Sequence, residues 1–333
     1  MLPDRTTLRR AAAAIAATLL LSLLFIGSYV GALHDPRPTD VPVAVAAQVP
    51  DEVAAALGRG GAIEVRRVAD AEQARRAIDR RDAYGALVAG RRGLELVTAP
   101  AASVAVAQLL RAELPPQLRQ AGATVRTTEV HALPTGDPRG LVSFYLAIGL
   151  VLAGYLGAAL LGLALGTELG LRQTGRRLLA IGVLAVLGGL LGTAVASAIG
   201  GGGAFGLCAL AGALTVAAVG AATVAFQRLL GFVGTGVSIL LFVILGNPAA
   251  GGAAPPELLP EPWRAVGQLL PNGAATTAIH DARYFPDASL AGPLLVLVAW
   301  TAVAVAVALL LGRRGRALSP EQEQAAAAAA AGV

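Results

Sequence analysis

The sequence predicts a polytopic α-helical membrane protein with six transmembrane helices and an extracytoplasmic α/β domain inserted between the first and second helices. The first observation is composition: 56% of the 333 residues are hydrophobic and only 14% are charged, with a mean hydropathy of +0.67. The second is a series of apolar blocks of about 20 residues, the length that crosses a bilayer as a helix. The third is that most charged residues lie between residues 35 and 139 or at the edges of these blocks. A soluble globular chain does not combine these features.

The first apolar block covers residues 11–33 and follows the basic residues Arg5, Arg9 and Arg10. It is longer than the apolar core of a cleaved signal peptide, about 7–15 residues, and no clear small-x-small cleavage site follows it. We therefore expect an uncleaved signal-anchor with residues 1–10 in the cytoplasm. A removed signal peptide is the alternative.

Five further apolar blocks form a predicted transmembrane domain over residues 140–312. They cover residues 141–165, 178–199, 205–226, 231–245 and 290–311. Arginines concentrate in alternate connections, so the positive-inside rule places both termini, including a tail at 313–333, in the cytoplasm of a plasma-membrane protein. The fifth block is short and follows several glycines, so we expect it to be tilted or partly broken. The many glycines and alanines predict close helix packing, with biased codon usage as the alternative.

Residues 34–139 predict a compact α/β domain. Its strands are expected at 41–49, 62–68, 83–88, 94–98 and 124–130, and its helices at 51–57, 71–81 and 102–120. Asp70 is expected to cap the second helix. From Asp35 to Asp137, 13 arginines balance 13 carboxylates, so the domain offers no strong field for a charged ligand. Four arginine pairs, including Arg80 with Arg81, predict either an anion-binding patch or a solvated helix face with acidic partners.

The sequence holds no pattern for catalysis, a metal or a cofactor. It has no lysine, which excludes the G-x-x-x-x-G-K-[ST] loop, so any ATP hydrolysis would need a partner subunit. The single cysteine, Cys208, lies in an apolar block, and His34, His131 and His280 match no metal-binding spacing. The basic residues flank membrane segments, which argues against a nucleic-acid partner. We therefore expect a protein that is not an enzyme, needs no cofactor and lies in the lipid bilayer.

The connection after the second block carries a candidate coupling loop. It contains Glu168, Arg172, Arg176 and Arg177 within residues 166–177. This segment can form a short amphipathic helix at the membrane interface, on which a cytoplasmic partner could push. A plain polar turn whose arginines set the topology is the alternative.

The connection before the last block predicts an outer re-entrant loop over residues 247–289. Prolines and glycines at intervals, with an aromatic anchor, suit short half-helices that dip into the outer interface, where tryptophan and tyrosine are favoured. The candidate residues of this loop are Asn247, Pro248, Gly251, Gly252, Pro260, Trp263 and Pro271.

Three motifs of this loop, N-P-x-x-G-G from Asn247, L-P-x-x-W-R from Leu259 and L-P-x-G from Leu270, support a family resemblance. Together with the Val41-Pro42-Val43-Ala44-Val45 segment and residues 83–88, the chain resembles the type 2 ABC transporter permease superfamily. The likeness is greatest to the phage-infection-protein and nitrosoguanidine-resistance branch. Relatives usually continue the first motif with an Asn-Asp-like pair, whereas this chain has Ala46-Ala47-Gln48.

The resemblance implies a permease that acts as a homodimer, with a path between two copies and re-entrant helices near its exit. It also implies export of hydrophobic or amphiphilic compounds, with a separate cytoplasmic ATPase as a further partner. Two other classes stay open. One is a membrane-anchored scaffold or receptor whose outer domain binds an envelope partner. The other is a membrane enzyme, which would require clustered polar residues at the interface.

Overall fold

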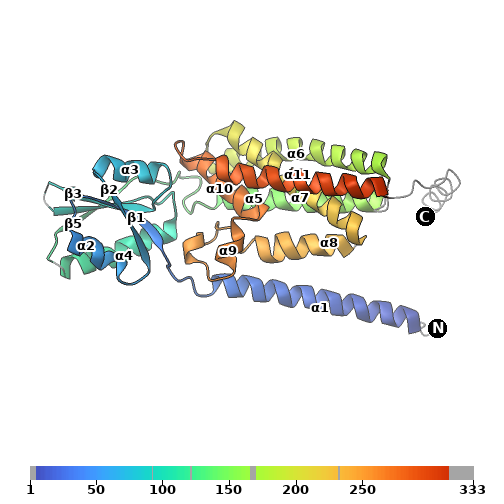
Figure 1. Cartoon of the computed structure of the whole chain (residues 1–333), viewed down its shortest axis with the longest axis horizontal. Coiled ribbons are helices and arrows are strands. Elements are labelled where there is room, and N and C mark those ends of the chain that lie inside the picture. The colour runs from blue at the N-terminus through green and yellow to red at the C-terminus, as the bar shows by residue number, and fades with distance from the viewer. Residues whose placement is uncertain (1–4, 92, 121, 166–169, 232, 315–333) are drawn as a thin grey trace.

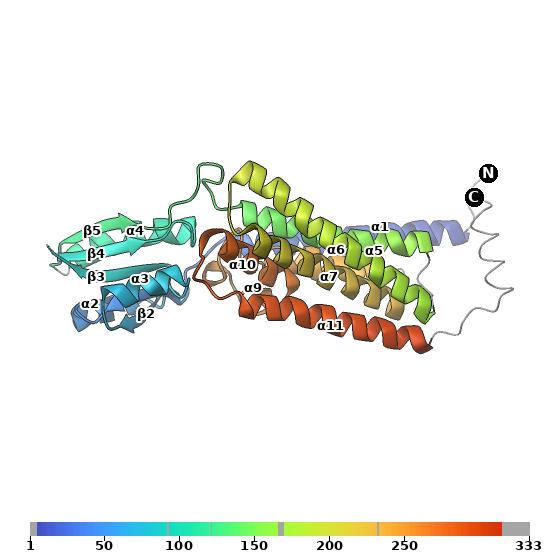
Figure 2. The same ribbon diagram turned by 90° about the horizontal axis from the view of Figure 1, so that it is seen from above.

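The structure, a computed structural model, describes residues 5–91, 93–120, 122–165, 170–231 and 233–314. An α/β domain lies at one end of an elongated molecule and a helical bundle forms the other (Figure 1). The helix α1, Arg5–Leu33, runs beside the bundle, and its N-terminal end lies far from the α/β domain. The C-terminal end of the last helix lies at that same far end (Figures 1 and 2).

The α/β domain holds a five-stranded sheet in the order β2-β1-β3-β4-β5. Each predicted strand overlaps one in the structure: β1 Val41–Ala46, β2 Ile63–Val68, β3 Gly85–Gly90, β4 Gly93–Thr98 and β5 Val125–Glu129. The strand β1 pairs in parallel with β2 and β3, β3 and β4 form an antiparallel hairpin, and β4 pairs in parallel with β5. The three helices are α2 Asp51–Gly58, α3 Ala71–Asp79 and α4 Val104–Gln120. The helix α3 covers one face of the sheet, and α2 and α4 cover the other (Figure 1).

The local sequence explains these elements. The strand β1 is buried along its whole length, as its unbroken apolar run requires for a central strand covered on both faces. The helix α3 buries Ala74 and Ile78 and exposes Glu72, Arg75 and Arg76. The carboxylate of Asp70 accepts a hydrogen bond from the backbone N–H of Gln73 at 2.7 Å, which confirms the predicted cap.

The bundle is built around α7, Phe205–Leu230, which is mostly buried. Its neighbours are α5 Val142–Leu165, α6 Leu171–Gly200 and α11 Ala291–Arg314. Glycines allow the close approach: a Cβ on Gly189 would lie 2.4 Å from the carbonyl oxygen of Ala209, and one on Gly154 would lie 2.9 Å from Cβ of Val219. The predicted close packing is therefore confirmed at these crossings.

Five helices among the described residues are long and apolar enough to cross a membrane. The predicted fifth block differs, because it forms a short apolar segment, α8 Val233–Ser238 followed by the π-helix η1 Ile239–Gly246. At the α-helical rise, these 14 residues would span about 21 Å, less than the ~30 Å hydrocarbon core. The helix ends where Asn247 and Pro248 follow, since proline lacks the N–H that would continue it. Six spans were predicted, with the fifth expected to be tilted or partly broken, and this fifth block is the one that is too short for a full crossing.

A second correction concerns the start of α6, which begins at Leu171 rather than near residue 178. The described part of the predicted coupling loop therefore belongs to the long helix and does not form a separate interfacial helix. At its other end, α6 meets α7 through a tight glycine turn, with φ of 80° at Gly201 and 158° at Gly203. The side chain of Arg283 fills the space beside Gly203 and donates hydrogen bonds to the carbonyls of Gly200 and Gly201.

Candidate functional site

The segment between η1 and α11 enters the bundle and leaves it by the same end. After Asn247 the chain runs out to the 3-10 turn η2, Pro256–Leu258, at the α/β domain, where the carbonyl of Glu257 accepts from the Thr39 N–H at 2.8 Å. It returns through α9, Trp263–Gly267, and then α10, Pro271–Tyr284, runs outward again. The Leu269 carbonyl accepts from Nε1 of Trp300 at 2.9 Å, in the third turn of α11. The start of α10 therefore lies about 14 Å inside the bundle.

A pair of buried amides holds the inner end of this segment. The Nδ2 group of Asn272 donates to Oδ1 of Asn247 at 2.7 Å and to the carbonyl oxygen of Phe242 at 2.8 Å. Phe242 belongs to the π-helix η1. Asn272 therefore joins the first turn of α10 to the interrupted helix beside it.

The other predicted residues of the outer loop have structural roles in this segment. Pro248 is buried directly after η1, and Pro271 is the first residue of α10. Gly251 has φ of +81°, and a Cβ on Gly252 would lie 2.3 Å from the ring of Phe144. The carbonyl of Pro260 accepts from Arg264, and Nε1 of Trp263 donates to Oγ of Ser28 in α1 at 3.0 Å.

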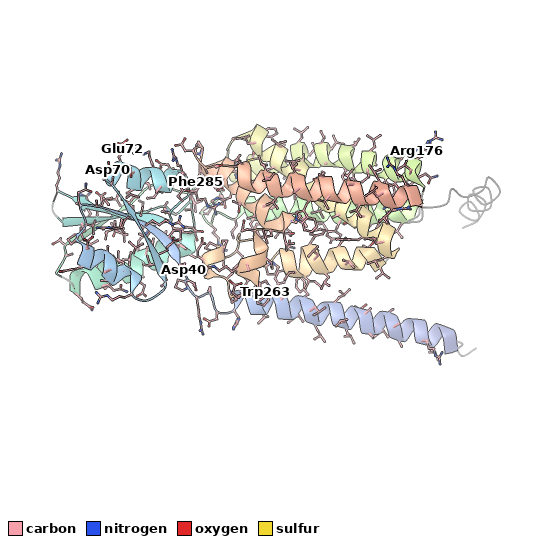
Figure 3. All side chains as sticks on the ribbon, in the orientation of Figure 1. Asp40, Asp70, Glu72, Arg176, Trp263 and Phe285 are labelled. Carbon is pink, nitrogen blue, oxygen red and sulfur yellow. The ribbon has the colours of Figure 1, made fainter. Side chains whose placement is uncertain are left out.

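Polar contacts fasten the α/β domain to this segment. Arg81 of the domain forms an ion pair with Asp281 in α10; their side chains are 16% and 7% exposed. The hydroxyl of Tyr84 donates to the carboxylate of Glu257 at 2.7 Å. Arg264 pairs with Asp40 at 3.1 Å and the Tyr284 hydroxyl donates to Asp137. In Figure 3, Asp40 and Phe285 lie where the α/β domain meets the bundle, and Trp263 lies beside the outer end of α1.

Phe285, directly after α10, completes the junction by packing into the core of the α/β domain, where it is fully buried. Its ring lies against His131 and His280, with centroid distances of 4.9 Å and 5.9 Å. Nε2 of His131 also lies within hydrogen-bond distance, 2.7 Å, of the Asp79 carboxylate. These two histidines, far apart in the sequence, therefore meet across one aromatic ring.

Burial sets the charge states at the junction. Burial, followed by the positive charge of Arg81, lowers the pKa of His280 to about 4, so its imidazole is neutral at neutral pH. Burial alone would raise the pKa of Asp281, but contact with His280 and the charge of Arg81 outweigh it and hold that pKa below its ordinary value. Burial also raises the pKa of Tyr84, and the neighbouring Glu257 carboxylate raises it further. Arg81 and Asp281 therefore face each other as a charged pair.

A cavity of about 430 Å³ lies between the α/β domain and the bundle. The first turn of α4 forms one part of its wall, and Arg80, Arg81 and Asp82 follow α3 into it. The start of α5 and the outer half of α10 form the opposite wall. Sequence reasoning missed this cavity because its walls come from segments up to about 250 residues apart, from Pro42 to Ser289. The Arg80–Arg81 pair gave the one local signal.

The predicted coupling residues do not form one surface. Arg172 and Arg176 are exposed in the first turns of α6, and Arg176 lies at the bundle end far from the α/β domain (Figure 3). Arg177 is fully buried and donates to the side chain of Gln227 and to the Ala158 carbonyl. Glu168 lies outside the described residues. Of the predicted coupling residues that the structure describes, Arg172 and Arg176 are therefore the exposed ones, and they share one face of α6.

Within the described residues, no group of three or more histidine, cysteine and carboxylate side chains could hold a metal ion. Cys208 is buried beside the Ile279 carbonyl, and Nδ1 of His34 contacts the Val30 carbonyl at 2.9 Å. Charged and polar side chains line the cavity at the junction of the domain and α10, and this junction is the candidate binding site.

Comparison with family models, curated proteins and solved structures found no match. The function of the chain is therefore inferred from its own residues and geometry.

Proposed function

We propose that the chain is the permease subunit of an ABC-2-type exporter that moves hydrophobic or amphiphilic compounds out of the cell. The observation that carries this proposal is the interrupted path of the chain, in which η1 stops inside the bundle and α10 starts beside it. The buried amide pair of Asn247 and Asn272 lies at that point.

A membrane anchor has no need of such a segment. One apolar helix of about 20 residues suffices to hold a domain at a bilayer. An interrupted helix instead leaves backbone groups that need partners inside the membrane, and it persists where it serves a site. Discontinuous helices of this kind form substrate paths in secondary transporters. The break beside Asn272 therefore favours transport over anchoring.

The proposed topology has six membrane segments, counting α8–η1 as a short one, with the α/β domain outside the cell and both termini in the cytoplasm. The exposed arginines Arg172, Arg176 and Arg313 support it, because they lie at the ends of α6 and α11 far from the α/β domain. That bias matches the positive-inside rule for a plasma-membrane protein. The long unburied surface of α1 supports a homodimer.

Cysteine labelling tests this topology. Cys208 is the only cysteine, so a Cys208→Ala background allows Arg59→Cys in the α/β domain and Arg176→Cys in α6 to be labelled separately. We expect a membrane-impermeant maleimide to label the first variant in intact cells and the second only after permeabilisation. Labelling of both from the same side would contradict the proposed arrangement.

Partner capture tests the exporter itself. We expect affinity purification in mild detergent, read by mass spectrometry, to recover an ATPase subunit with the wild-type chain. An Arg172→Ala/Arg176→Ala variant should lose it, whereas the matched control Arg59→Ala/Arg75→Ala, changed on the α/β domain, should retain it. Recovery of envelope proteins alone, unchanged in both variants, would contradict the motor-driven mechanism.

That outcome would favour the second candidate, a membrane-anchored scaffold or receptor. A second hollow of about 310 Å³ in the α/β domain supports this alternative. It lies between α2 and α4, with Leu57, Leu109 and Leu114 in its wall. An apolar hollow of this kind can accept a side chain of an envelope partner.

A further inference from the structure

We propose that the cavity between the α/β domain and α10 binds the oxyanion group, a carboxylate or phosphate, of an amphiphilic ligand. This inference rests on the proposed export function, because it assigns a head group to the transported class. Binding can be measured without transport, so the two proposals can fail separately.

The N-terminus of α4 provides the first donors. Val104 and Ala105, its first two residues, line the cavity together with the preceding Ser103. Backbone N–H groups at such positions have no acceptor within the helix, and the helix dipole places partial positive charge there. The hydroxyl of Ser103 accepts from the Val106 N–H at 3.3 Å, and the first turn contains no acidic residue. This end of α4 is therefore open to an external anion.

His280 is the second and independent feature. It lines the same cavity, the residue is 9% exposed, and its Nδ1 atom has no hydrogen-bond partner among the described residues. Oδ1 of Asp281 lies 3.6 Å from Nδ1, beyond hydrogen-bond distance. Buried polar atoms are rarely left unpaired, because the loss of water contacts is then not compensated. A neutral imidazole with its proton on Nδ1 can donate to an acceptor, and an oxyanion is such an acceptor.

Arginines supply the charge. Arg80 and Arg139 line the cavity from the α/β domain and from the segment before α5, and neither has a carboxylate partner in the part of the chain that the structure describes. Arg81 uses Nη1 for Asp281, and a guanidinium carries four further N–H donors. The cavity lining holds four arginines and three carboxylates in all. One of those carboxylates, Glu257, already accepts the hydroxyl of Tyr84.

The bundle side of the cavity offers a surface for the apolar part of the amphiphilic ligand. Leu141 and Phe144, at the start of α5, line it, as do Ala253 and Pro255. The head group would lie at α4 and the arginines, and the apolar chain would extend along α5. A volume of about 430 Å³ falls within the range of roughly 300–1,000 Å³ for small-molecule sites.

The test compares ligands that share one alkyl chain and differ in head group. The full chain is placed in nanodiscs of neutral phosphatidylcholine and titrated calorimetrically with dodecyl phosphate, dodecyltrimethylammonium and inorganic phosphate. We expect saturable binding of dodecyl phosphate alone. An Arg80→Gln/Arg139→Gln variant should bind it about tenfold more weakly, the scale of one or two charge-assisted contacts at partly exposed sites.

The matched control is Arg59→Gln/Arg75→Gln, which removes two exposed arginines of the same domain that do not line the cavity. It should bind like the wild type, which separates the site from partition into lipid and from net charge. Circular dichroism shows whether each variant is folded. Equal binding by wild type and the Arg80→Gln/Arg139→Gln variant, or equal binding of the cationic amphiphile, would overturn the proposal. If inorganic phosphate bound as tightly as dodecyl phosphate, the proposal that the ligand is amphiphilic would be overturned.

Transport and head-group binding can fail independently of each other. A chain that recruits an ATPase but shows no head-group preference would retain the export function and lose this inference. A chain that binds dodecyl phosphate through Arg80 and Arg139 but recruits no ATPase would retain the binding site and lose the motor-driven mechanism.

Discussion

The ion pair between Arg81 and Asp281 is expected to control how firmly the α/β domain is attached to α10. Removing one partner of a fully buried pair costs about 3–5 kcal/mol, because the other charge is left without compensation. Arg81 keeps 16% of its side chain exposed, so water stabilises part of the released charge and we expect a loss of about 2–3 kcal/mol. Each 1.4 kcal/mol is tenfold in an equilibrium, so the junction should open roughly 30- to 150-fold more often.

Hydrogen exchange at the junction measures this opening directly. The amides of α10 and of β3 should lose protection in Asp281→Asn and in Arg81→Met, while those of α7 should not change. The double variant removes both charges, and it should therefore recover much of the protection lost in either single variant. Opening energies that simply add in the double variant would show that the two charges do not stabilise each other across the junction.

Three further perturbations follow. Gly189→Ala places a Cβ 2.4 Å from the Ala209 carbonyl oxygen and should lower the free energy of unfolding by about 1–3 kcal/mol. The control Gly182→Ala places its Cβ in open space and should have little effect. Equal thermal midpoints for the two variants would contradict the close packing of α6 against α7. The folded pKa of His280, about 4, lies below its ordinary 6.5, so the unfolded chain is protonated first as pH falls. As the pH falls from 6.5 to about 4, the free energy of unfolding should therefore decrease, by about 3 kcal/mol at the acid end. Thermal melts in which His280→Gln shows the same dependence of stability on pH as the wild type would refute this. Asn272→Leu leaves two buried acceptors, the Phe242 carbonyl and Oδ1 of Asn247, without their donor, which should lower the free energy of unfolding by about 1–3 kcal/mol. A denaturation midpoint equal to that of the wild type would exclude this loss.

The elements of the fold could be predicted where a local pattern reports on burial. Short runs of apolar and β-branched residues located all five strands, and Asp70 marked the start of α3 because a short carboxylate three residues before a free N–H is a local signal. The apolar blocks located the long helices for the same reason.

Local patterns failed where distant segments decide the outcome. Arg177 was assigned to an exposed loop, yet α6 begins before it and its guanidinium is buried against Gln227. Gly162 makes this possible, because a Cβ there would lie 3.1 Å from the Gln227 side chain and 3.2 Å from Arg177. The pair of Arg81 and Asp281 joins residues 200 positions apart, and neither has a neighbour in the sequence that predicts the other. The candidate cavity depends on such pairs and had no sequence signature of its own.

Export from cells is the most direct test of the central claim. Cells that lack the native protein would be loaded with a radiolabelled amphiphile, and its efflux measured with the wild-type chain, with Asn272→Leu, with Gly182→Ala and with an empty vector. We predict faster efflux with the wild type and Gly182→Ala than with Asn272→Leu or the vector, because the proposed path includes the interrupted helix η1 that Asn272 of α10 contacts. Equal efflux in all four strains, with each variant folded and in the membrane, would contradict the assignment as an exporter.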